Sequence, residues 1–117
     1  MCGIAVAIGL NGRMIERSAV ERMADSLFHR GPDDSGIYLD ASVGMGFRRL
    51  SILDLSEAGH QPMVTADQQC VLVFNGEIFN YVELRAELRT LGYEFRSSGD
   101  SEVLLTAYRE WGRECLS

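Results

Sequence analysis

The order of apolar patterns along the chain constrains the fold more than any other feature of these 117 residues. Short runs rich in β-branched and aromatic residues alternate with three stretches whose apolar residues recur every three or four positions. The strand-like runs are residues 3–8, 35–40, 43–53, 70–76 and 93–99, of which 3–8 and 70–76 read as buried. The helical stretches are residues 18–31, 80–92 and 100–112. Helices on one side of a largely antiparallel sheet predict an α+β fold.

Capping residues mark the ends of the first two helical stretches. Ser18 and Glu21 have the spacing of a capping box, and so do Asn80 and Glu83. Gly92 closes the second helix, because glycine accepts the left-handed conformation found after a helix end. The expected inward stripes are Val20, Met23, Ala24, Leu27 and Phe28, then Leu84, Leu88 and Leu91, then Val103, Leu104, Ala107, Tyr108 and Trp111.

Charge and cysteine usage exclude several classes of protein. The formal net charge of −6 argues against nucleic-acid and anionic-membrane partners, since both need a basic surface. No apolar run approaches the roughly 18 residues of a membrane span, and the start lacks the pattern of a signal peptide. The three cysteines are odd in number and have no metal-like spacing. We therefore expect a reduced cytoplasmic protein with neither a disulfide framework nor a metal site.

Cys2, directly behind the initiator methionine, has two readings. Cysteine often packs as a small buried hydrophobe. Removal of Met1 would instead leave the thiol beside a free α-amine, whose reference pKa of about 7.7–8.0 suits a general base. Neither His29, at a helix end, nor His60, in a loop, has a companion at catalytic or metal-like spacing, so we expect both to be structural.

Three further sites also carry two readings each. Asn75-Gly76 favours a hairpin turn, but its carboxamide and unobstructed N–H could together stabilise an oxyanion. Alternation places Arg48 and Arg49 on opposite faces of a strand. Either they are a charge pair at the edge of the strand, or one of them lies in a polar pocket and binds a carboxylate. Asp100 at a helix start is either an N-cap or the partner of an ammonium group.

Six segments, taken together, resemble one family. In chain order they are MCGI, HRGPDDSGIY, RRLSILDL, GHQPM, VFNGEIFNY and SGDSEVLL. Their order and spacing are similar to those of class II glutamine amidotransferase domains, which are N-terminal nucleophile hydrolases, and most of all to the glutaminase domain of glutamine-hydrolysing asparagine synthetases. The proline of RGPD discriminates, because phosphoribosyl-amidotransferase relatives usually carry glutamine there. The resemblance covers essentially the whole chain.

The resemblance implies a role for each matching residue. Cys2 would be the nucleophile, with its own α-amine as base, so a retained Met1 would abolish the base. Asn75 and Gly76 would form the oxyanion hole. The glutamine-binding residues would be Arg49 for the α-carboxylate, backbone groups around Leu50 and Ile52, Glu77 for the polar end of the substrate, and Asp100 for the α-ammonium.

The resemblance also implies a larger protein. Glutamine would be hydrolysed to glutamate, and ammonia would pass through a tunnel to a synthetase domain that activates aspartate with ATP and Mg²⁺. That domain is absent from residues 1–117, which contain no P-loop. Family domains are four-layer αββα sandwiches, so we expect an incomplete N-terminal portion. Half a sandwich leaves a face uncovered, which predicts a homo-oligomer, low stability or inactivity.

Two alternatives remain open. The ammonia could go to an acceptor other than aspartate, which the missing domain would choose. Alternatively, the chain could be a non-catalytic fragment that binds glutamine or a partner protein without turnover.

Overall fold

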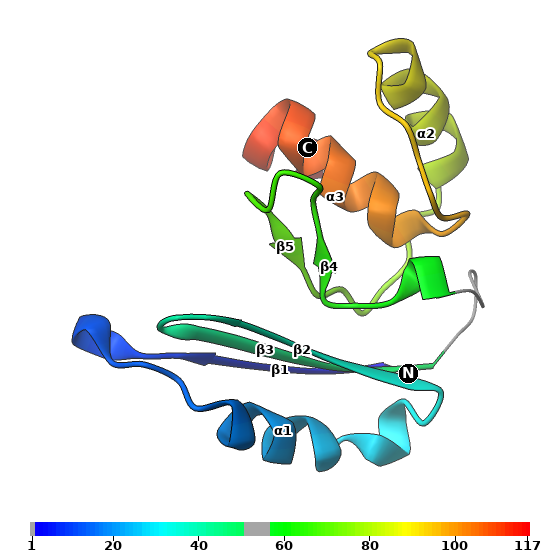
Figure 1. The fold of residues 1–117 in the computed structure, drawn as a ribbon. Helices are drawn as coiled ribbons and strands as arrows, with labels where there is room; N and C mark the ends of the chain where they lie inside the picture. Colours follow the sequence, from blue (N-terminus) through cyan, green and yellow to red (C-terminus); the bar gives the residue numbers. More distant parts are fainter. Residues whose placement is uncertain (1, 51–56) are drawn as a thin grey trace. The chain divides into compact units, whose positions relative to one another are not determined.

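Three antiparallel strands form the larger sheet, in the order β1–β3–β2 (Figure 1). They are β1 (Gly3–Ile8), β2 (Asp34–Asp40) and β3 (Val43–Arg49). A tight turn joins β2 to β3, and Ala41 in that turn has φ 48°, in the left-handed region. β1 pairs with the other side of β3, from Gly3 opposite Arg48 to Ile8 opposite Val43. The predicted strand at residues 3–8 therefore has the observed bounds.

The computed structural model describes residues 2–50 and 57–117, which group into two compact units. The first unit holds residues 2–50, 60–62 and 73–75, and the second holds 57–59, 63–72 and 76–117. Both contain helices and antiparallel strands, so the α+β prediction is confirmed.

Helix α1 (Arg17–Asp25) lies on one face of the larger sheet. It approaches closely because β3 carries glycine at the contact positions. A Cβ on Gly44 would lie 2.5 Å from Val20 Cγ2, and one on Gly46 would lie 3.0 Å from Ala24 Cβ. Val20 and Ala24 are correspondingly buried. Small residues on the strand thus allow the helix to pack on the backbone of the sheet.

The opposite face of β1 is less covered than expected. Gly3 and Ala5 are buried, whereas Ile4, Val6 and Ile8 are exposed. Successive side chains of a strand point to opposite faces, and Gly3, Ala5 and Ala7 share the face of α1. The prediction of a wholly buried strand is wrong for that reason, since α1 covers one face only.

The start and end of the first helix differ from the prediction. The N-cap is Glu16, without a side-chain cap, and Ser18 lies inside the first turn, so the proposed capping box is wrong. Glu21 instead forms an ion pair with Arg17 (Nε–Oε1 2.9 Å). The helix ends at Asp25, where the Ser26 hydroxyl donates to the Met23 carbonyl (2.6 Å) in the i−3 pattern that competes with helix continuation.

A 3₁₀ turn, Phe28–Arg30, follows that helix end. The stripe prediction fails for Met23 and Phe28, which are exposed. Leu27 is half-buried, and a Cβ on Gly3 would lie 2.8 Å from its Cβ. The change from α to 3₁₀ geometry shifts the side-chain positions, so a single helical stripe does not extend to residue 28.

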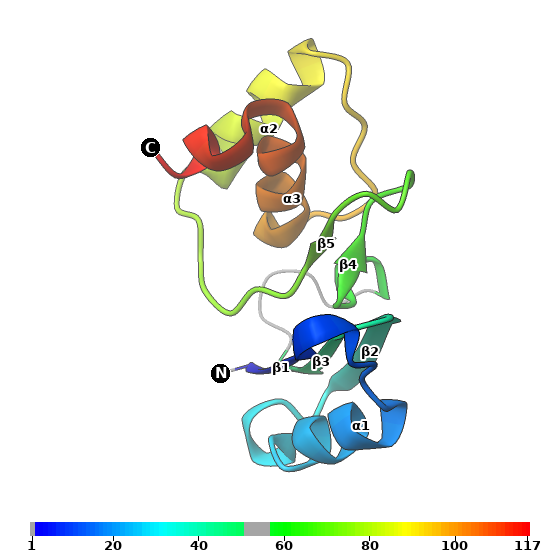
Figure 2. The same ribbon diagram turned by 90° about the vertical axis from the view of Figure 1, so that its left-hand side faces the viewer.

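Helices α2 (Tyr81–Thr90) and α3 (Asp100–Trp111) pack together in the second unit (Figure 2). Their shared core is Leu88, Val103 and Ala107. The partly buried residues packed against this core are Tyr81, Leu84, Tyr93, Phe95, Trp111 and Cys115. The two-residue strands β4 (Met63–Val64) and β5 (Val71–Leu72) pair antiparallel, and β5 contacts α3.

The end of α2 confirms the role predicted for Gly92. This residue has φ +99°. Its N–H donates to the Arg89 carbonyl, and the Tyr93 N–H donates to the Leu88 carbonyl (3.1 and 3.2 Å). This pair of bonds is the Schellman arrangement, and Tyr93 also packs on the core beside Leu88. At the other end Asn80 is the N-cap residue, but its side chain makes no capping bond.

Several finer predictions in the second unit are wrong. Only Val71–Leu72 of residues 70–76 pair as a strand, and they are half-buried. Residues 93–99 belong to no strand. In α3, Val103 and Ala107 are buried as predicted, but Tyr108 is exposed and Leu105, outside the predicted stripe, is buried. The helix contacts both α2 and β5, so it buries two faces, and a one-face pattern cannot describe it.

Candidate functional site

Cys2 lies one residue before β1, half-buried, with its sulfur against the backbone of Leu50. The Leu50 N–H donates to Cys2 Sγ at 3.3 Å, and Sγ lies 3.6 Å from the Leu50 carbonyl oxygen. Leu50 directly follows β3, so β1 and β3, paired side by side, bring the two residues together. A backbone N–H aimed at sulfur can donate to a thiol or a thiolate. The thiol is therefore held at the end of the sheet.

The two adjacent arginines point to opposite faces, as predicted. Arg48 shares the face of Gly44 and Gly46 and lies against the turn after α1, over the ring of Phe28 at 4.8 Å. Arg49, the last residue of β3, is only 8% exposed. It is thus a buried cation on the face away from α1. Strand alternation continued back from Ile4 places Cys2 on that same face.

Asn75 belongs to the first unit but not to a hairpin. β5 ends at Leu72, and the chain runs on to α2 at Tyr81, so the hairpin reading of Asn75-Gly76 is wrong. The side chain of Asn75 is exposed. The preceding residue is tied down, because the Phe74 N–H donates to Gln61 Oε1 at 2.6 Å.

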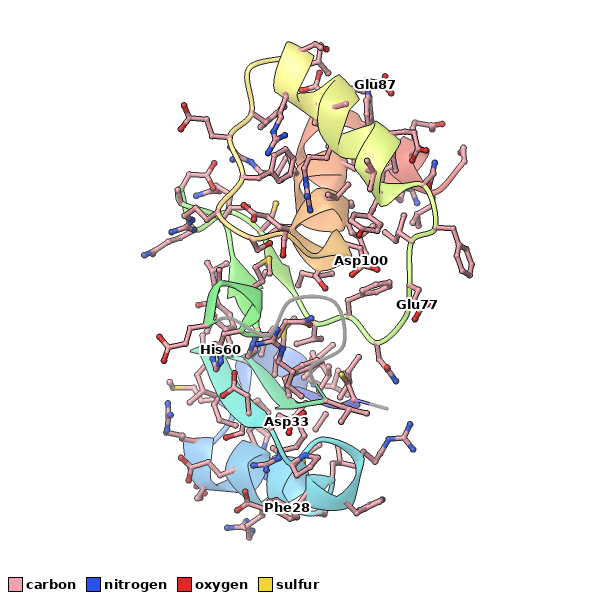
Figure 3. All side chains as sticks on the ribbon, turned by 90° about the vertical axis from the view of Figure 1, so that its right-hand side faces the viewer. Phe28, Asp33, His60, Glu77, Glu87 and Asp100 are labelled. Atoms are coloured by element: carbon pink, nitrogen blue, oxygen red, sulfur yellow. The ribbon has the colours of Figure 1, made fainter. Side chains whose placement is uncertain are left out.

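Gly76, Glu77 and Asp100 belong to the second unit. Asp100 is 6% exposed, and its Oδ2 accepts a bond from the Ile78 N–H at 2.9 Å. The N-cap of α3 is Gly99, so the capping reading of Asp100 is wrong: it is the first residue of the helix. Its carboxylate instead holds the segment that carries exposed Glu77, and Figure 3 labels both residues. Ile52 lies outside the described residues.

A scan against family models matches residues 1–117 to one family, described as glutamine amidotransferase domain. The chain belongs to the class II glutamine amidotransferase domain family.

Curated relatives of this glutamine amidotransferase domain include three long proteins. Asparagine synthetase [glutamine-hydrolyzing] 1 of Bacillus subtilis is 46% identical over 87% of this chain and 16% of its own length. The asparagine synthetase [glutamine-hydrolyzing] of Zea mays is 37% identical over 97% of this chain and 19% of its own. A putative asparagine synthetase [glutamine-hydrolyzing] 2 of Methanocaldococcus jannaschii is 37% identical over 99% of this chain and 25% of its own length. The chain thus spans a quarter or less of the length of these relatives.

Arg30 is a contact residue of Cys2 that our sequence reading did not single out. Its Nε donates to the Cys2 carbonyl at 3.1 Å, across 28 positions in sequence. Arg48 supports this arrangement, since its Nε donates to the Gly31 carbonyl at 3.0 Å and so fixes the turn that carries Arg30. A Cβ on Gly31 would collide with the Arg48 backbone. The RG pair inside HRGPD was the available signal, because glycine there permits the close approach.

His60 makes a structural contact in this amidotransferase domain. Its Nδ1 lies 2.5 Å from Asp34 Oδ2 on β2, while His29 is exposed in the 3₁₀ turn. Within residues 2–50 and 57–117, no group of three or more His, Cys, Asp or Glu residues could hold a metal ion. In the same residues no helix is both long and apolar enough to cross a membrane.

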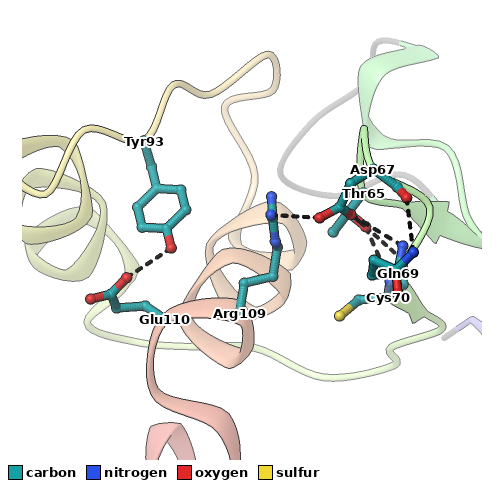
Figure 4. Close-up of polar contacts among 7 residues, drawn as sticks. All are labelled: Thr65, Asp67, Gln69, Cys70, Tyr93, Arg109 and Glu110. Carbon is teal, nitrogen blue, oxygen red and sulfur yellow. Dashed lines mark hydrogen bonds and ion pairs between the residues drawn. The ribbon is translucent and has the colours of Figure 1, made fainter.

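The groups with shifted pKa values lie in the second unit, at residues outside the predicted site (Figure 4). A hydrogen bond from the Thr65 hydroxyl (2.6 Å) lowers the pKa of Asp67, helped by the Gln69 N–H and Arg109. The bond from the Tyr93 hydroxyl to Glu110 (2.7 Å) raises the pKa of Tyr93. Both groups lie at the surface: Asp67, in the loop between β4 and β5, pairs with Arg109 of α3, and Tyr93, just after α2, bonds to Glu110 of α3.

Proposed function

We propose that this chain is the N-terminal part of the glutaminase domain of an asparagine synthetase, an incomplete αββα sandwich that hydrolyses glutamine through Cys2. The observation that carries the proposal is the position of the Cys2 thiol. It lies next to the chain start and against the backbone of Leu50, whose neighbour in sequence is the buried cation Arg49. The thiol and the cation thus belong to the same end of one sheet, as a nucleophile and the group that binds its substrate's carboxylate would.

The proposed first step is attack by Cys2 sulfur on the side-chain amide carbon of glutamine. After removal of Met1 the α-amine of Cys2 takes the thiol proton, so no histidine is needed. The carbonyl electrons move to oxygen, where the Asn75 carboxamide and the Gly76 N–H stabilise the oxyanion, each by about 3–4 kcal/mol. The C–N bond then breaks, and the nitrogen leaves as ammonia with the proton returned by the α-ammonium.

The second step is hydrolysis of the γ-glutamyl thioester. Water attacks the thioester carbon and gives up one proton to the Cys2 amine. The C–S bond breaks, which releases glutamate and restores the thiol. Arg49 would bind the substrate α-carboxylate, with backbone groups around Leu50 and Ile52. Asp100 would bind the α-ammonium and Glu77 the polar end.

The relatives named as asparagine synthetases support aspartate as the ammonia acceptor, in a synthetase domain outside these residues. ATP and Mg²⁺ would act in that domain. The whole enzyme would be a cytoplasmic ligase of amino-acid biosynthesis.

The experiment that tests the proposal combines intact mass with glutamate release. In the full-length protein we expect Met1 to be absent and glutamate to form from glutamine. A variant with one alanine inserted between Met1 and Cys2 is the matched control: it keeps the thiol but moves the free amine away from it, so it should be inactive. A protein that retains Met1 and binds glutamine without turnover would support the non-catalytic alternative and overturn the proposal. Release of glutamate with no asparagine formed by the full-length protein would indicate a different acceptor.

A further inference from the structure

The residues that hold Asn75 in place differ from those that hold Cys2, and they begin in the segment His60–Pro62. This segment lies against β2. A Cβ on Gly36 would collide with the Gln61 carbonyl oxygen, and it would lie 2.7 Å from His60 Nε2. The bond between His60 and Asp34 adds a second contact to the same strand. The backbone of Gln61 is therefore fixed on the sheet that carries Arg49.

The side chain of Gln61 extends this arrangement to the predicted oxyanion donors. Gln61 is 5% exposed, and its Oε1 accepts the bond from the Phe74 N–H at 2.6 Å. Because a backbone N–H can only donate, the atom that faces it is the amide oxygen. Phe74 belongs to no helix or strand, so its position depends on contacts of this kind.

The position of Phe74 determines where Asn75 begins, since consecutive Cα atoms are about 3.8 Å apart. Oxyanion donors act only when they are preorganised at the position that the developing charge will occupy. An exposed loop that carries Asn75 and Gly76 needs support from a rigid element. The sheet supplies it through Gln61.

We propose that Gln61 is the positioning residue of the oxyanion hole. By accepting the bond from the Phe74 N–H, it fixes the backbone that leads into Asn75 relative to the sheet. This inference rests on the proposed function, because Asn75 and Gly76 act as oxyanion donors only in a glutaminase. In this proposal Gln61 acts through the Phe74 N–H and takes no part in the chemistry itself. Its loss should therefore lower kcat more than it raises KM, since the oxyanion exists only in the transition state.

The test uses three variants of the full-length protein and one control. Gln61→Met keeps the length of the side chain and removes the acceptor. Gln61→Asn keeps the acceptor but withdraws it by one methylene. Gln61→Glu keeps the shape, and its carboxyl has an acceptor oxygen in either protonation state. Gln69→Met makes the same chemical change at an exposed glutamine.

The first measurement is hydrogen exchange of the Phe74 amide, which needs no activity. We expect exchange to become about tenfold faster or more in Gln61→Met and Gln61→Asn, as for loss of a hydrogen bond worth roughly 1–1.5 kcal/mol. Protection should persist in Gln61→Glu and Gln69→Met. If Gln61→Met does not fold, Gln61→Asn carries the same expectation. Unchanged exchange in a folded acceptor-deficient variant overturns the proposal.

The second measurement is glutamine hydrolysis. We expect kcat to fall about 100-fold in Gln61→Met, the size of effect that a displacement of about 1 Å produces, with KM changed less than threefold. Gln61→Glu should restore kcat to within about tenfold of the parent, and reaction of Cys2 with iodoacetamide should be unchanged throughout. A parent protein with no hydrolysis contradicts the proposed function. A parent that hydrolyses glutamine, with Gln61→Met at full kcat, contradicts the role of Gln61.

Discussion

Two regions of the molecule, one in each unit, hold their polar side chains in different ways. Around the candidate site of the first unit, side chains bond to backbone groups far away in sequence: Arg30 to Cys2, Cys2 to Leu50, and Gln61 to Phe74. On the outer surface of the second unit, exposed side chains pair with one another, as in Arg109 with Asp67 and Tyr93 with Glu110. Bonds of the first kind fix the backbone itself. Exposed pairs contribute little, since solvent screens them and side-chain entropy opposes them.

This difference orders the expected effects of mutation. Substitutions at the Cys2 end of the first unit should lower the rate of glutamine hydrolysis or weaken glutamine binding. Changes at the glycine contacts should remove packing, and changes at the surface pairs of the second unit should be barely measurable. Asp100 is an exception within the second unit, because its buried carboxylate also bonds a distant backbone N–H, as the residues around Cys2 do.

The largest effect is expected for Cys2→Ser. Loss of the thiol should lower kcat for glutamine hydrolysis by at least about 1000-fold, as removal of a catalytic nucleophile does in other enzymes. Cys115→Ser is the control, because Cys115 packs at the margin of the α2–α3 core. It should keep kcat within about twofold. A Cys2→Ser protein with near-parental turnover would show that the reaction does not use this thiol.

Arg49→Ala should raise KM. Loss of a charged hydrogen bond worth about 1.5–3 kcal/mol corresponds to roughly a 10- to 150-fold increase. Because Arg49 is buried, the variant also needs a check of its folding by circular dichroism. Arg49→Lys retains the charge without the bidentate geometry and should give an intermediate KM. Equal KM values for all three proteins would remove Arg49 from the substrate-binding residues.

Two glycine substitutions, one in each unit, separate the cost of a steric clash from the cost of a left-handed backbone. Gly44→Ala in the first unit should destabilise by about 1–3 kcal/mol through its clash with Val20. Gly92→Ala in the second unit meets no atom within 4 Å, but its φ of +99° should cost about 1–2 kcal/mol. Urea unfolding measures both changes.

The causes can be separated by second substitutions. Val20→Ala should reduce the penalty of Gly44→Ala in a double-mutant cycle, whereas Gly92→Asn should be milder than Gly92→Ala, since asparagine tolerates the left-handed region. Additive effects of Gly44→Ala and Val20→Ala would contradict the close contact of α1 with β3.

The smallest effect is the pH dependence of the surface pairs. The folded-state pKa of Asp67 lies below its ordinary value of 3.8, so its contribution is present above that pH and is lost as the pH falls through the folded pKa. The pKa of Tyr93 lies above 10.0, so its contribution is present below pH 10.0 and is lost as the pH rises through the raised pKa. The melting temperature of Asp67→Asn should match that of the parent below the folded pKa of Asp67 and lie slightly below it at higher pH. The melting temperature of Tyr93→Phe should lie slightly below that of the parent up to pH 10.0 and match it above the raised pKa of Tyr93. A large drop at neutral pH would contradict the ranking.

Local patterns predicted the parts of the fold that depend on local physics. The bounds of β1, the left-handed Gly92 and the extent of α3 follow from residues that are neighbours in sequence. The capping box at Ser18 was wrong because the helix begins one residue earlier, at Arg17, with Glu16 as its N-cap. The predicted stripe of α3 was right for Val103 and Ala107 but missed the buried Leu105, because β5 covers a second face that the periodicity of one helix does not contain.

The candidate site shows the same division. Residue chemistry alone indicated a thiol, a cation, an anion and amide donors, and the family resemblance supplied their roles. Arg30 and Gln61 were missed because each acts on the backbone of a residue 28 or 13 positions away. The strand pairing and the segment His60–Pro62 create those contacts, and no spacing along the chain encodes them.

The central claim is that Cys2 attacks the side chain of a bound glutamine. It is tested most directly by labelling with a glutamine analogue whose side-chain amide is replaced by an electrophilic ketone. Peptide mapping after reaction should find the label on Cys2 and not on Cys70 or Cys115. Glutamine should protect Cys2, and Arg49→Ala should slow its labelling. Equal labelling of all three cysteines, or a rate on Cys2 that neither glutamine nor Arg49→Ala changes, would contradict the account.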